Sequence, residues 1–399
     1  MKPLSTLAEA VHASSTMAID SMYKNMKAQG IDVVGFGAGE PDFPTPDNIK
    51  AACIRALSEN KTKYTAASGI IELKQAVCHR MKEDCGVDYT PSQVIIASGA
   101  KHIVYLTVRA LVNPGDEVVI PAPYWVSYSE IVRMCGGIPV IAQTREEDEF
   151  KLTPQELDEA ITDNTKCVLF NSPSNPTGMM YTREELRALA DVCIARDVYI
   201  IADEIYYKLV YDGREFVSVA ALGEDVKERT ILINGVSKSY AMTGWRIGYS
   251  LAPEYITKVM SNYVSHSTAA PSTLSQWAAV EALTGPQDTV ETMRQAFEER
   301  RNYMVDRVNS MELVSCLKPE GAFYIMMNIR KVFGKKCGDV VIDSCDTFAS
   351  QLLEKGLVAV VPGSGFDAPN YVRWSYATSL DNIKEGMDRL EKFLSTLTD

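Results

Sequence analysis

Histidine is scarce in this sequence, and long apolar runs and basic clusters are missing from it. Only four of the 399 residues are histidine and none of the nine cysteines forms a C-x-x-C pair, so a structural zinc site would be hard to build, and no metal is expected. No apolar run approaches about 18 residues, which excludes an ordinary membrane-spanning helix. Lys and Arg number 40 against 52 Asp and Glu, and no basic block interrupts the net charge of −12. This balance disfavours a general affinity for nucleic acid or anionic membrane.

The cysteines are odd in number and scattered along the chain, and Cys167 and Cys193 lie in apolar stretches. We interpret them as reduced, buried residues of a cytoplasmic protein, the alternative being a redox or metal-binding role. The first ten residues contain no continuous apolar segment of about seven residues or more, so no secretory signal is expected there. The sequence therefore predicts a cytoplasmic location.

Length and composition indicate a globular chain with more than one domain. At roughly 150 residues per domain, 399 residues correspond to between two and three domains. Apolar residues make up 46% and charged residues 23%, which argues against a disordered or fibrous chain. We expect a large domain over residues 47–290 and a smaller one built from both chain ends, residues 1–46 and 291–399.

Short β-rich runs alternate with helical patterns through the middle of the chain, which is typical of an α/β layered domain. The runs are continuously apolar, which indicates strands buried on both faces of a mostly parallel sheet. A helix is predicted over 182–196, with Thr182 as N-cap and Glu185 three residues on. Charged helices are predicted over 290–308 and 380–397. The seven expected strands are 94–97, 117–120, 139–142, 167–170, 198–202, 230–233 and 246–250.

Polar side chains follow three consecutive strands of this predicted sheet. Asn175 comes after the fourth strand, Asp203 and Tyr206 after the fifth, and Lys238 after the sixth. Ligands of open α/β sheets bind beyond the carboxyl ends of the strands, so we expect these side chains at one rim. Each also has a structural interpretation: Asn175 as a turn former before Pro176, Asp203 as a helix cap, and Lys238 as a solvated surface lysine.

Taken together, these residues match what pyridoxal phosphate requires. This cofactor needs a lysine that holds its aldehyde as a Schiff base, a carboxylate that keeps its ring nitrogen protonated, and a donor at its phenolate oxygen. Lys238, Asp203 and Tyr206 would supply them. The segment S-G-A at 98–100 precedes an apolar helical run, so a phosphate would lie on N–H groups at a helix N-terminus, with Arg246 as a charge-assisted clamp.

The string S-K-S-Y-A-M-T-G-W-R-I-G-Y at 237–249 resembles the lysine signature of class I aminotransferases, which have the fold-type I architecture of pyridoxal-phosphate enzymes. The similarity spans most of the chain and is greatest to the bacterial aspartate aminotransferase branch. It implies a large cofactor-binding domain with a mostly parallel seven-stranded sheet flanked by helices, and a smaller α+β domain. Further matching segments are G-A-G-E-P-D-F at 37–43, K-Y-T at 63–65, P-Y-W-V-S-Y at 123–128, N-S-P-S-N-P-T-G at 171–178, A-D-E-I-Y at 202–206 and R-W-S-Y-A at 373–377.

The resemblance implies catalytic roles for three residues. Lys238 is the Schiff-base lysine and then moves a proton between the substrate Cα and the cofactor C4′, Asp203 pairs with the ring nitrogen, and Tyr206 donates to the ring 3-oxygen. Trp125 stacks on the ring, and Asn175 contacts both ring oxygen and substrate. The implied cofactor-binding set is Lys238, Gly99, Ala100, Lys101, Trp125, Asn175, Asp203, Tyr206, Ser237, Arg246 and Tyr64.

The resemblance also implies how the substrate and a second subunit contribute. The backbone of Gly39 and the guanidinium of Arg373 hold the α-carboxylate, while Tyr64 reaches the phosphate of a neighbouring subunit in a homodimer. Without the resemblance, Arg373 would be interpreted as an ion-pair arginine, Tyr64 as half-buried packing and Trp125 as an ordinary aromatic core residue. The implied substrate-binding set is Gly39, Trp125, Asn175, Arg373 and Lys101.

Three positions depart from patterns found in the family. Gly235 stands three residues before Lys238, where several branches carry a phosphate-binding serine, and Ser237 is the nearest hydroxyl. No arginine lies between residues 246 and 294 to bind a distal carboxylate from the partner subunit, as one does in the animal-type enzymes. The resemblance to the bacterial branch implies a lysine at the start of the phosphate-binding helix in its place, and Lys101 stands there, the alternative being a solvent-facing helix start. His12 stands where members that act on prephenate carry a lysine.

The expected reaction is a ping-pong transamination in which L-aspartate and 2-oxoglutarate give oxaloacetate and L-glutamate. The alternatives are aminotransferases of aromatic, branched-chain, alanine or prephenate specificity and, further away, a carbon–sulfur β-lyase. A cofactor-sensing transcription regulator is disfavoured, because G-A-G-E-P-D ends by residue 42 and leaves no room for a DNA-binding domain before it.

Overall fold

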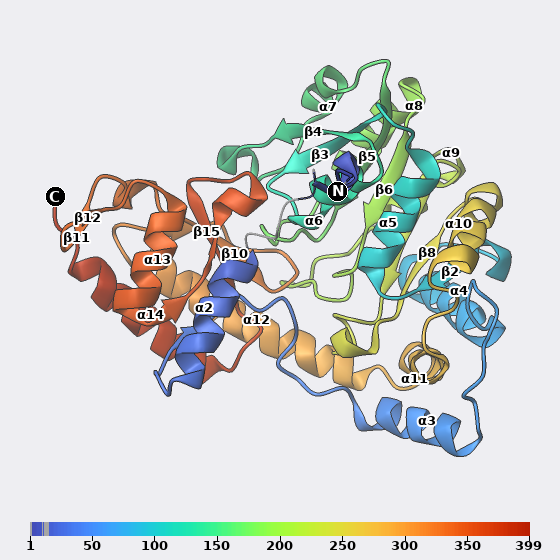
Figure 1. The fold of residues 1–399 in the computed structure, drawn as a ribbon, viewed down its shortest axis with the longest axis horizontal. Helices are drawn as coiled ribbons and strands as arrows, with labels where there is room; N and C mark the ends of the chain where they lie inside the picture. The colour runs from blue at the N-terminus through green and yellow to red at the C-terminus, as the bar shows by residue number, and fades with distance from the viewer. Residues whose placement is uncertain (1, 10, 12–15) are drawn as a thin grey trace.

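The computed structural model describes residues 2–9, 11 and 16–399 of the chain. Its larger sheet has seven strands, all parallel except β8, which runs antiparallel to both of its neighbours (Figure 1). The predicted fold class is confirmed. In spatial order the strands are β2 Val94–Ala97, β8 Gly248–Leu251, β7 Thr230–Gly235, β6 Tyr199–Asp203, β5 Thr165–Asn171, β3 Glu117–Ala122 and β4 Ile138–Gln143.

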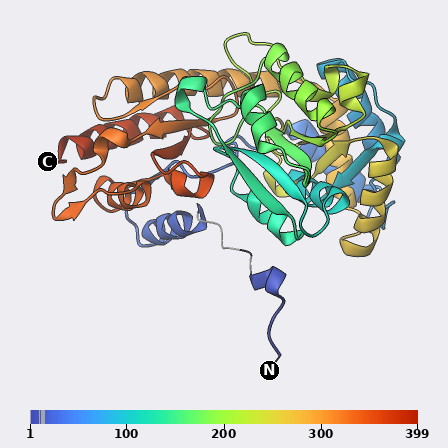
Figure 2. The ribbon, with the colours of Figure 1, turned by 90° about the horizontal axis from the view of Figure 1, so that it is seen from above.

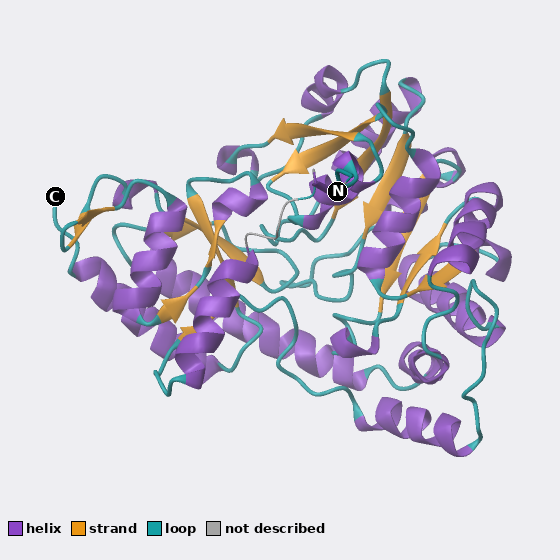
Figure 3. Cartoon of the chain, viewed as in Figure 1, coloured by secondary structure: helices purple, strands orange, loops and turns teal. Residues whose placement is uncertain are grey.

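Helices cover both faces of this sheet (Figure 3) because alternate residues of the apolar strands point to opposite sides. Ile201 and Ile231 pack with α5 Ala100–Leu111, α6 Ser127–Met134 and α10 Glu254–Ser267. Ile200 and Leu232 belong to the apolar clusters of the other face. That face is covered by α3 Asp47–Ser58, α4 Ile71–Cys85, α7 Pro154–Ala160, α8 Arg183–Ala195, α9 Glu224–Lys227 and α11 Thr273–Thr284.

The predicted helix over 182–196 is α8, and its N-terminal signal works as expected. The Thr182 hydroxyl accepts from the Glu185 N–H at 3.2 Å, and Glu185 Oε2 accepts from the Thr182 N–H at 2.7 Å. This reciprocal capping satisfies two N–H groups that the helix itself leaves unpaired. The last predicted strand is shorter than expected, since Arg246 adopts a left-handed φ of 56° and β8 begins only at Gly248.

A second, antiparallel sheet lies at the other end of the molecule. Helix α12 Asp288–Asn309 extends from the second sheet toward α11 (Figure 1). It lies beside α14 Leu380–Ser395 (Figure 2), and an Arg307–Asp388 ion pair of 2.8 Å joins the two helices. The remaining helices are α1 Thr6–Glu9, α2 Thr16–Ala28 and α13 Cys345–Gly356. The four strands, in order, are β14 Val361–Pro362, β15 Tyr371–Ser375, β10 Tyr324–Asn328 and β9 Ser315–Cys316.

The two chain ends meet in this second part. Strand β1 Val34–Gly35 pairs in parallel with β13 Val358–Ala359, and Phe36 packs in one apolar cluster with residues of the C-terminal region. A short pair, β11 Lys336–Cys337 and β12 Val340–Val341, completes the strands of the described residues. The domain boundaries at residues 46 and 290 stay a prediction.

All nine cysteines are free thiols, and each is buried or half-buried. Burial raises the pKa of the Cys167 thiol to about 12, which keeps it protonated and unreactive. Within residues 2–9, 11 and 16–399 we find no group of three His, Cys, Asp or Glu placed to hold a metal ion. None of the helices in these same ranges is long and apolar enough to cross a membrane.

Candidate active site

A cavity of about 690 Å³ lies where the carboxyl ends of β5, β6 and β7 face the second sheet. Its walls include α2, the segment 35–40, the start of α5, the segment 125–128, the strand ends of the large sheet, the loop 237–246 and the second sheet. All of the predicted site residues line it except Gly99 and Tyr64. The expectation that ligand-binding groups gather at this rim is met.

Lys238 follows β7 and is half-buried in the cavity wall. Its Nζ donates to the carbonyl oxygen of Gly39 at 2.5 Å. Burial lowers the pKa of Lys238 to about 8, although the nearby Glu40 carboxylate opposes that shift. A substantial fraction of the amine is therefore neutral near physiological pH, and a neutral amine is the nucleophilic form.

Asp203 ends β6 and is only 3% exposed. Its Oδ2 accepts from the Tyr128 hydroxyl at 2.7 Å, and its Oδ1 accepts from the Ile205 N–H at 3.2 Å. Burial raises the pKa of Asp203 to about 6, and the bond from Tyr128 is the largest opposing effect. The carboxylate is thus held in place, and no cation of the described residues lies within ion-pair distance of it, which suits it to a positively charged ligand group.

Sequence reasoning missed Tyr128. It lies in the P-Y-W-V-S-Y segment three residues after Trp125, and the two rings meet edge to face with centroids 5.3 Å apart. Its bond to Asp203 spans 75 positions of sequence. The available signal was its spacing of three residues from Trp125. In a helical segment, that spacing would place the Trp125 and Tyr128 side chains on the same face.

Tyr206 is buried beside a second tyrosine that the sequence did not single out. Its hydroxyl lies 3.1 Å from the hydroxyl of Tyr324, which begins β10, and the rings pack edge to face. Tyr324 is fully buried against Phe323. Nothing in the local sequence marks Tyr324, because the contact joins residues 118 positions apart.

Arg373 lies in the middle of β15, 5% exposed, and faces the cavity. Its Nη1 donates to Asn175 Oδ1 and its Nη2 to the carbonyl oxygen of Gly37, both at 2.9 Å, while its buried Nε has no partner. Burial lowers the pKa of Arg373. In the part of the chain that the structure describes, no carboxylate lies within ion-pair distance of this guanidinium. A buried cation without a counter-charge is costly, so it points to an anionic ligand.

The N-terminus of α5 forms the next wall. Gly99 has a φ of +88°, and a Cβ there would lie 2.3 Å from Arg246 Nη2, so only glycine fits. Arg246 donates through Nη1 to the Thr243 carbonyl at 2.8 Å. Among the described residues, the N–H groups of Ala100 and Lys101 have no acceptor. Free N–H groups at a helix N-terminus beside an arginine make an anion-binding site.

The departure at Gly235 has a steric reason. Gly235 pairs with Gly248, and a Cβ on it would lie 2.9 Å from the Ile247 carbonyl oxygen, so a serine would not fit at this position. Ser237, two residues further on, is buried in the cavity wall.

Lys101 lies on the first turn of α5 with its Nζ 4.8 Å from the centroid of the Trp125 ring. Partial burial, and then the charge of Arg246, lowers the pKa of Lys101. No acidic partner for Lys101 is found among the described side chains. Lys101, Arg246 and Arg373 all line the cavity, and none of these three has an ion-pair partner among the described residues.

Tyr64 lies outside the cavity and is 98% exposed. Within one chain the structure does not bring it to the other predicted residues. His12, which bears on the prephenate alternative, lies outside the described residues.

Residues 31–390 match the family described as aminotransferase class I and II. The chain belongs to this family. It is 50% identical over 382 residues, 96% of each chain, to an aspartate aminotransferase of Geobacillus stearothermophilus. It is also 46% identical, over 99% of each chain, to an aspartate/prephenate aminotransferase of Cereibacter sphaeroides. The crystal structure of an aspartate aminotransferase from Rhizobium meliloti is similar with a TM-score of 0.97 at 40% identity, covering 100% of both chains.

The predicted family and the aminotransferase class of the reaction are thereby confirmed. For a class I and II aminotransferase, the cavity between the two sheets is the candidate active site, because it gathers the lysine, the buried carboxylate and the unpaired cations described above. The individual roles of these residues stay predictions.

Proposed function

We propose that this chain is an aspartate aminotransferase that uses pyridoxal phosphate. It transfers the amino group of L-aspartate to 2-oxoglutarate by a ping-pong exchange. The observation that carries the proposal is the set of three unpaired cations, Lys101, Arg246 and Arg373, around one cavity. The cofactor has one phosphate and a dicarboxylic substrate has two carboxylates, and each of these three cations would bind one of those anionic groups.

The residues present fit the cofactor. Arg246 and the free N–H groups of Ala100 and Lys101 form an anion site for its phosphate. Asp203, whose raised pKa reflects burial, becomes fully ionised beside a protonated ring nitrogen, and Tyr206 offers a hydroxyl to the ring 3-oxygen. When bound, pyridoxal phosphate supplies an electron sink for the bond electrons of the substrate Cα.

The protein's own part in the reaction is binding, orientation and proton transfer. Arg373 holds the α-carboxylate through its two Nη groups, and the Oδ1 of Asn175 fixes the guanidinium. The backbone of Gly39 completes this carboxylate site. The Nζ of Lys238 is neutral for much of the time near pH 8, so it can take a proton from the substrate Cα and return one at C4′. Trp125 closes the site over the ring.

The relatives support dicarboxylic specificity, since the names of those described above begin with aspartate. A second candidate activity, on prephenate, is favoured by the name of the Cereibacter sphaeroides relative. Prephenate also carries two carboxylates, so the same cations would serve it.

We also propose a homodimer with shared active sites in the cytoplasm. Tyr64 follows α3, whose Ile54 and Leu57 are also exposed, as is Ile71 at the start of α4. Exposed apolar side chains of this kind are typical of an interface, and a second subunit would cover them. A monomeric mass by analytical ultracentrifugation at micromolar concentration would contradict the dimer. The free, buried cysteines fit a reducing compartment.

The direct test is a half-reaction. The purified protein, loaded with pyridoxal phosphate, is mixed with L-aspartate in the absence of any 2-oxo acid, and the absorbance of the cofactor is followed. We expect rapid conversion of the cofactor to its amine form with an equal amount of oxaloacetate. Conversion by L-phenylalanine or L-alanine but not by L-aspartate would overturn the dicarboxylic specificity and keep the reaction class.

Lys101→Ala should separate dicarboxylic from monocarboxylic substrates. Loss of a charge-assisted bond to the distal carboxylate is expected to raise KM for L-aspartate by about 10- to 100-fold. KM for L-alanine, which has no distal carboxylate, should change less than about threefold. Steady-state kinetics of Lys101→Ala with both amino donors measure the two changes in KM, and L-alanine serves as the control. Equal effects on the two donors would place Lys101 outside the substrate site.

A further inference from the structure

Tyr324 contacts more of the candidate site than any role assigned above explains. Its hydroxyl lies 3.1 Å from that of Tyr206, and the guanidinium carbon of Arg373 lies 4.4 Å from its ring centroid. Gly39 approaches the same hydroxyl so closely that a Cβ there would lie 3.2 Å from it. One buried side chain thus joins the proposed donor to the cofactor oxygen and the proposed carboxylate site.

We propose that Tyr324 is a positioning residue with two separable contributions: its hydroxyl supports Tyr206 and its ring supports Arg373. The proposal rests on the proposed function, in which Tyr206 serves the cofactor and Arg373 the substrate. The two contributions come from different atoms of one residue, so different substitutions remove them.

The hydroxyl contribution follows from counting donors. A tyrosine hydroxyl has one proton to donate, so when Tyr206 donates to the cofactor ring oxygen its own oxygen is left to accept. Among the described residues, the hydroxyl that lies within hydrogen-bond distance of it is that of Tyr324, at 3.1 Å. A hydroxyl that accepts one hydrogen bond becomes a better donor of another. Tyr324 therefore strengthens the hydrogen bond that Tyr206 donates to the cofactor ring oxygen.

The ring contribution follows from the missing counter-charge. The guanidinium of Arg373 has no acidic partner among the described residues, and it lies over the faces of Tyr324 and Phe366 at 4.4 and 5.1 Å. An aromatic face attracts a cation most strongly where water is excluded. The two rings therefore stabilise the guanidinium by cation–π contacts and leave its N–H groups available to a carboxylate.

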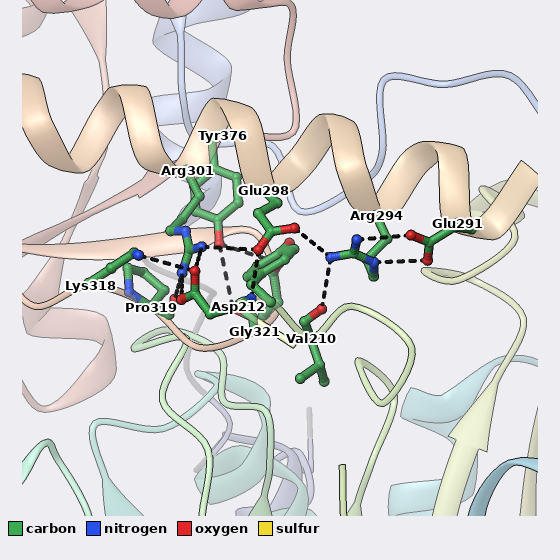
Figure 4. Close-up of polar contacts among 12 residues, drawn as sticks. Val210, Asp212, Glu291, Arg294, Glu298, Arg301, Lys318, Pro319, Gly321 and Tyr376 are labelled. Carbon is green, nitrogen blue, oxygen red and sulfur yellow. Dashed lines mark hydrogen bonds and ion pairs between the residues drawn. The ribbon is translucent and has the colours of Figure 1, made fainter. Parts of the chain in front are cut away.

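The chain around Tyr324 is fixed firmly enough for such a role. Figure 4 shows the buried Arg301 of α12 bound to Asp212 at 2.8 and 2.9 Å and to the Pro319 carbonyl at 2.6 Å. The Ala322 N–H donates to the Leu209 carbonyl at 2.9 Å. These hydrogen bonds join the segment that contains Tyr324 to the segment that follows Tyr206. They therefore fix the positions of the two hydroxyls relative to each other.

The test uses Tyr324→Phe, Tyr324→Leu and a matched control, Tyr376→Phe. Tyr376 is equally buried nearby, and its hydroxyl contacts the carbonyl oxygens of Gly321 and Ala322, at 3.5 and 3.4 Å, and the side chain of Tyr211. Each variant is loaded with pyridoxal phosphate and titrated with pH while its absorbance is recorded. Binding of the non-reactive dicarboxylate maleate is then measured by the same absorbance.

Tyr324→Phe removes only the hydroxyl. A weaker donor at Tyr206 leaves more negative charge on the ring oxygen, which holds a neighbouring proton more tightly, so the absorbance midpoint should rise by about half a pH unit. Maleate affinity should change less than about twofold. Tyr324→Leu removes the ring as well, so it should shift the midpoint similarly and weaken maleate binding about tenfold. Tyr376→Phe should do neither.

The outcomes separate this inference from the proposed function. If the parent protein does not convert its cofactor with L-aspartate, the proposed function fails and the role of Tyr324 fails with it. If the parent converts L-aspartate but both Tyr324 variants behave like Tyr376→Phe, only the role of Tyr324 is overturned. Thermal melts confirm folding, and Tyr324→Met replaces the leucine variant if that variant does not fold.

Discussion

Lys238→Ala is expected to lower turnover of L-aspartate by at least about 10³-fold while the protein stays folded. Lys238 lies in the cavity wall, three residues after the end of β7. Burial lowers the pKa of its amine to about 8. Alanine removes both the covalent attachment point and the group that moves the proton at Cα. Binding of the cofactor through its phosphate and ring would remain, so the loss should fall on kcat.

The measurement is single-turnover absorbance with L-aspartate, together with a thermal melt. Lys392→Ala, at an exposed lysine of α14 that does not line the cavity, is the matched control and should keep parental activity. In the parent protein, the rate at which the cofactor-free form captures pyridoxal phosphate covalently should rise with pH through about 8, since deprotonation makes the amine of Lys238 nucleophilic. Normal turnover in Lys238→Ala would end the assignment.

The large sheet was predictable because its strands are short, apolar and separated by helices. The same logic placed Asp203 and Lys238 at one rim, since parallel strands end on one edge of a sheet. The direction of β8 could not be predicted, because Gly248–Leu251 is buried along its whole length like its neighbours β2 and β7, and the reversal follows from the loop after Lys238. The strands of the second sheet are two to five residues long, too short to show a period.

The residues of the candidate site also fall into those that the sequence predicted and those that needed the structure. Motif residues such as Asn175 and Arg246 were predicted, because local strings carry them. Tyr128 and Tyr324 were not, because each acts through a side-chain contact across 75 or 118 positions. The unpaired state of Arg373 also needed the structure, since a sequence does not show which carboxylates lie out of reach.

Arg373→Lys and Arg373→Met should both lose activity without losing stability. Lysine keeps the charge but cannot offer two parallel N–H donors to a carboxylate, so kcat/KM for L-aspartate should fall by about 100-fold. Methionine removes the charge as well, and the loss should reach about 10³-fold or more. KM should rise in both variants, since the α-carboxylate is bound throughout the reaction. The control is Arg187→Lys, a surface arginine paired with Asp191 and Asp225, which should keep parental kinetics.

Stability distinguishes a binding arginine from a structural one. Arg373 is 5% exposed and has no ion-pair partner among the described residues, so folding buries its charge at a cost that two hydrogen bonds, to Gly37 and Asn175, only partly offset. Arg373→Met relieves that cost, and its melting temperature without substrate should lie within about 3 °C of the parent or above it. A structural arginine would behave oppositely, since its removal would lower the melting temperature and spare the kinetics. Unchanged KM for L-aspartate in Arg373→Lys would remove Arg373 from the carboxylate site, because a bound carboxylate must sense the change from a two-donor fork to a single ammonium.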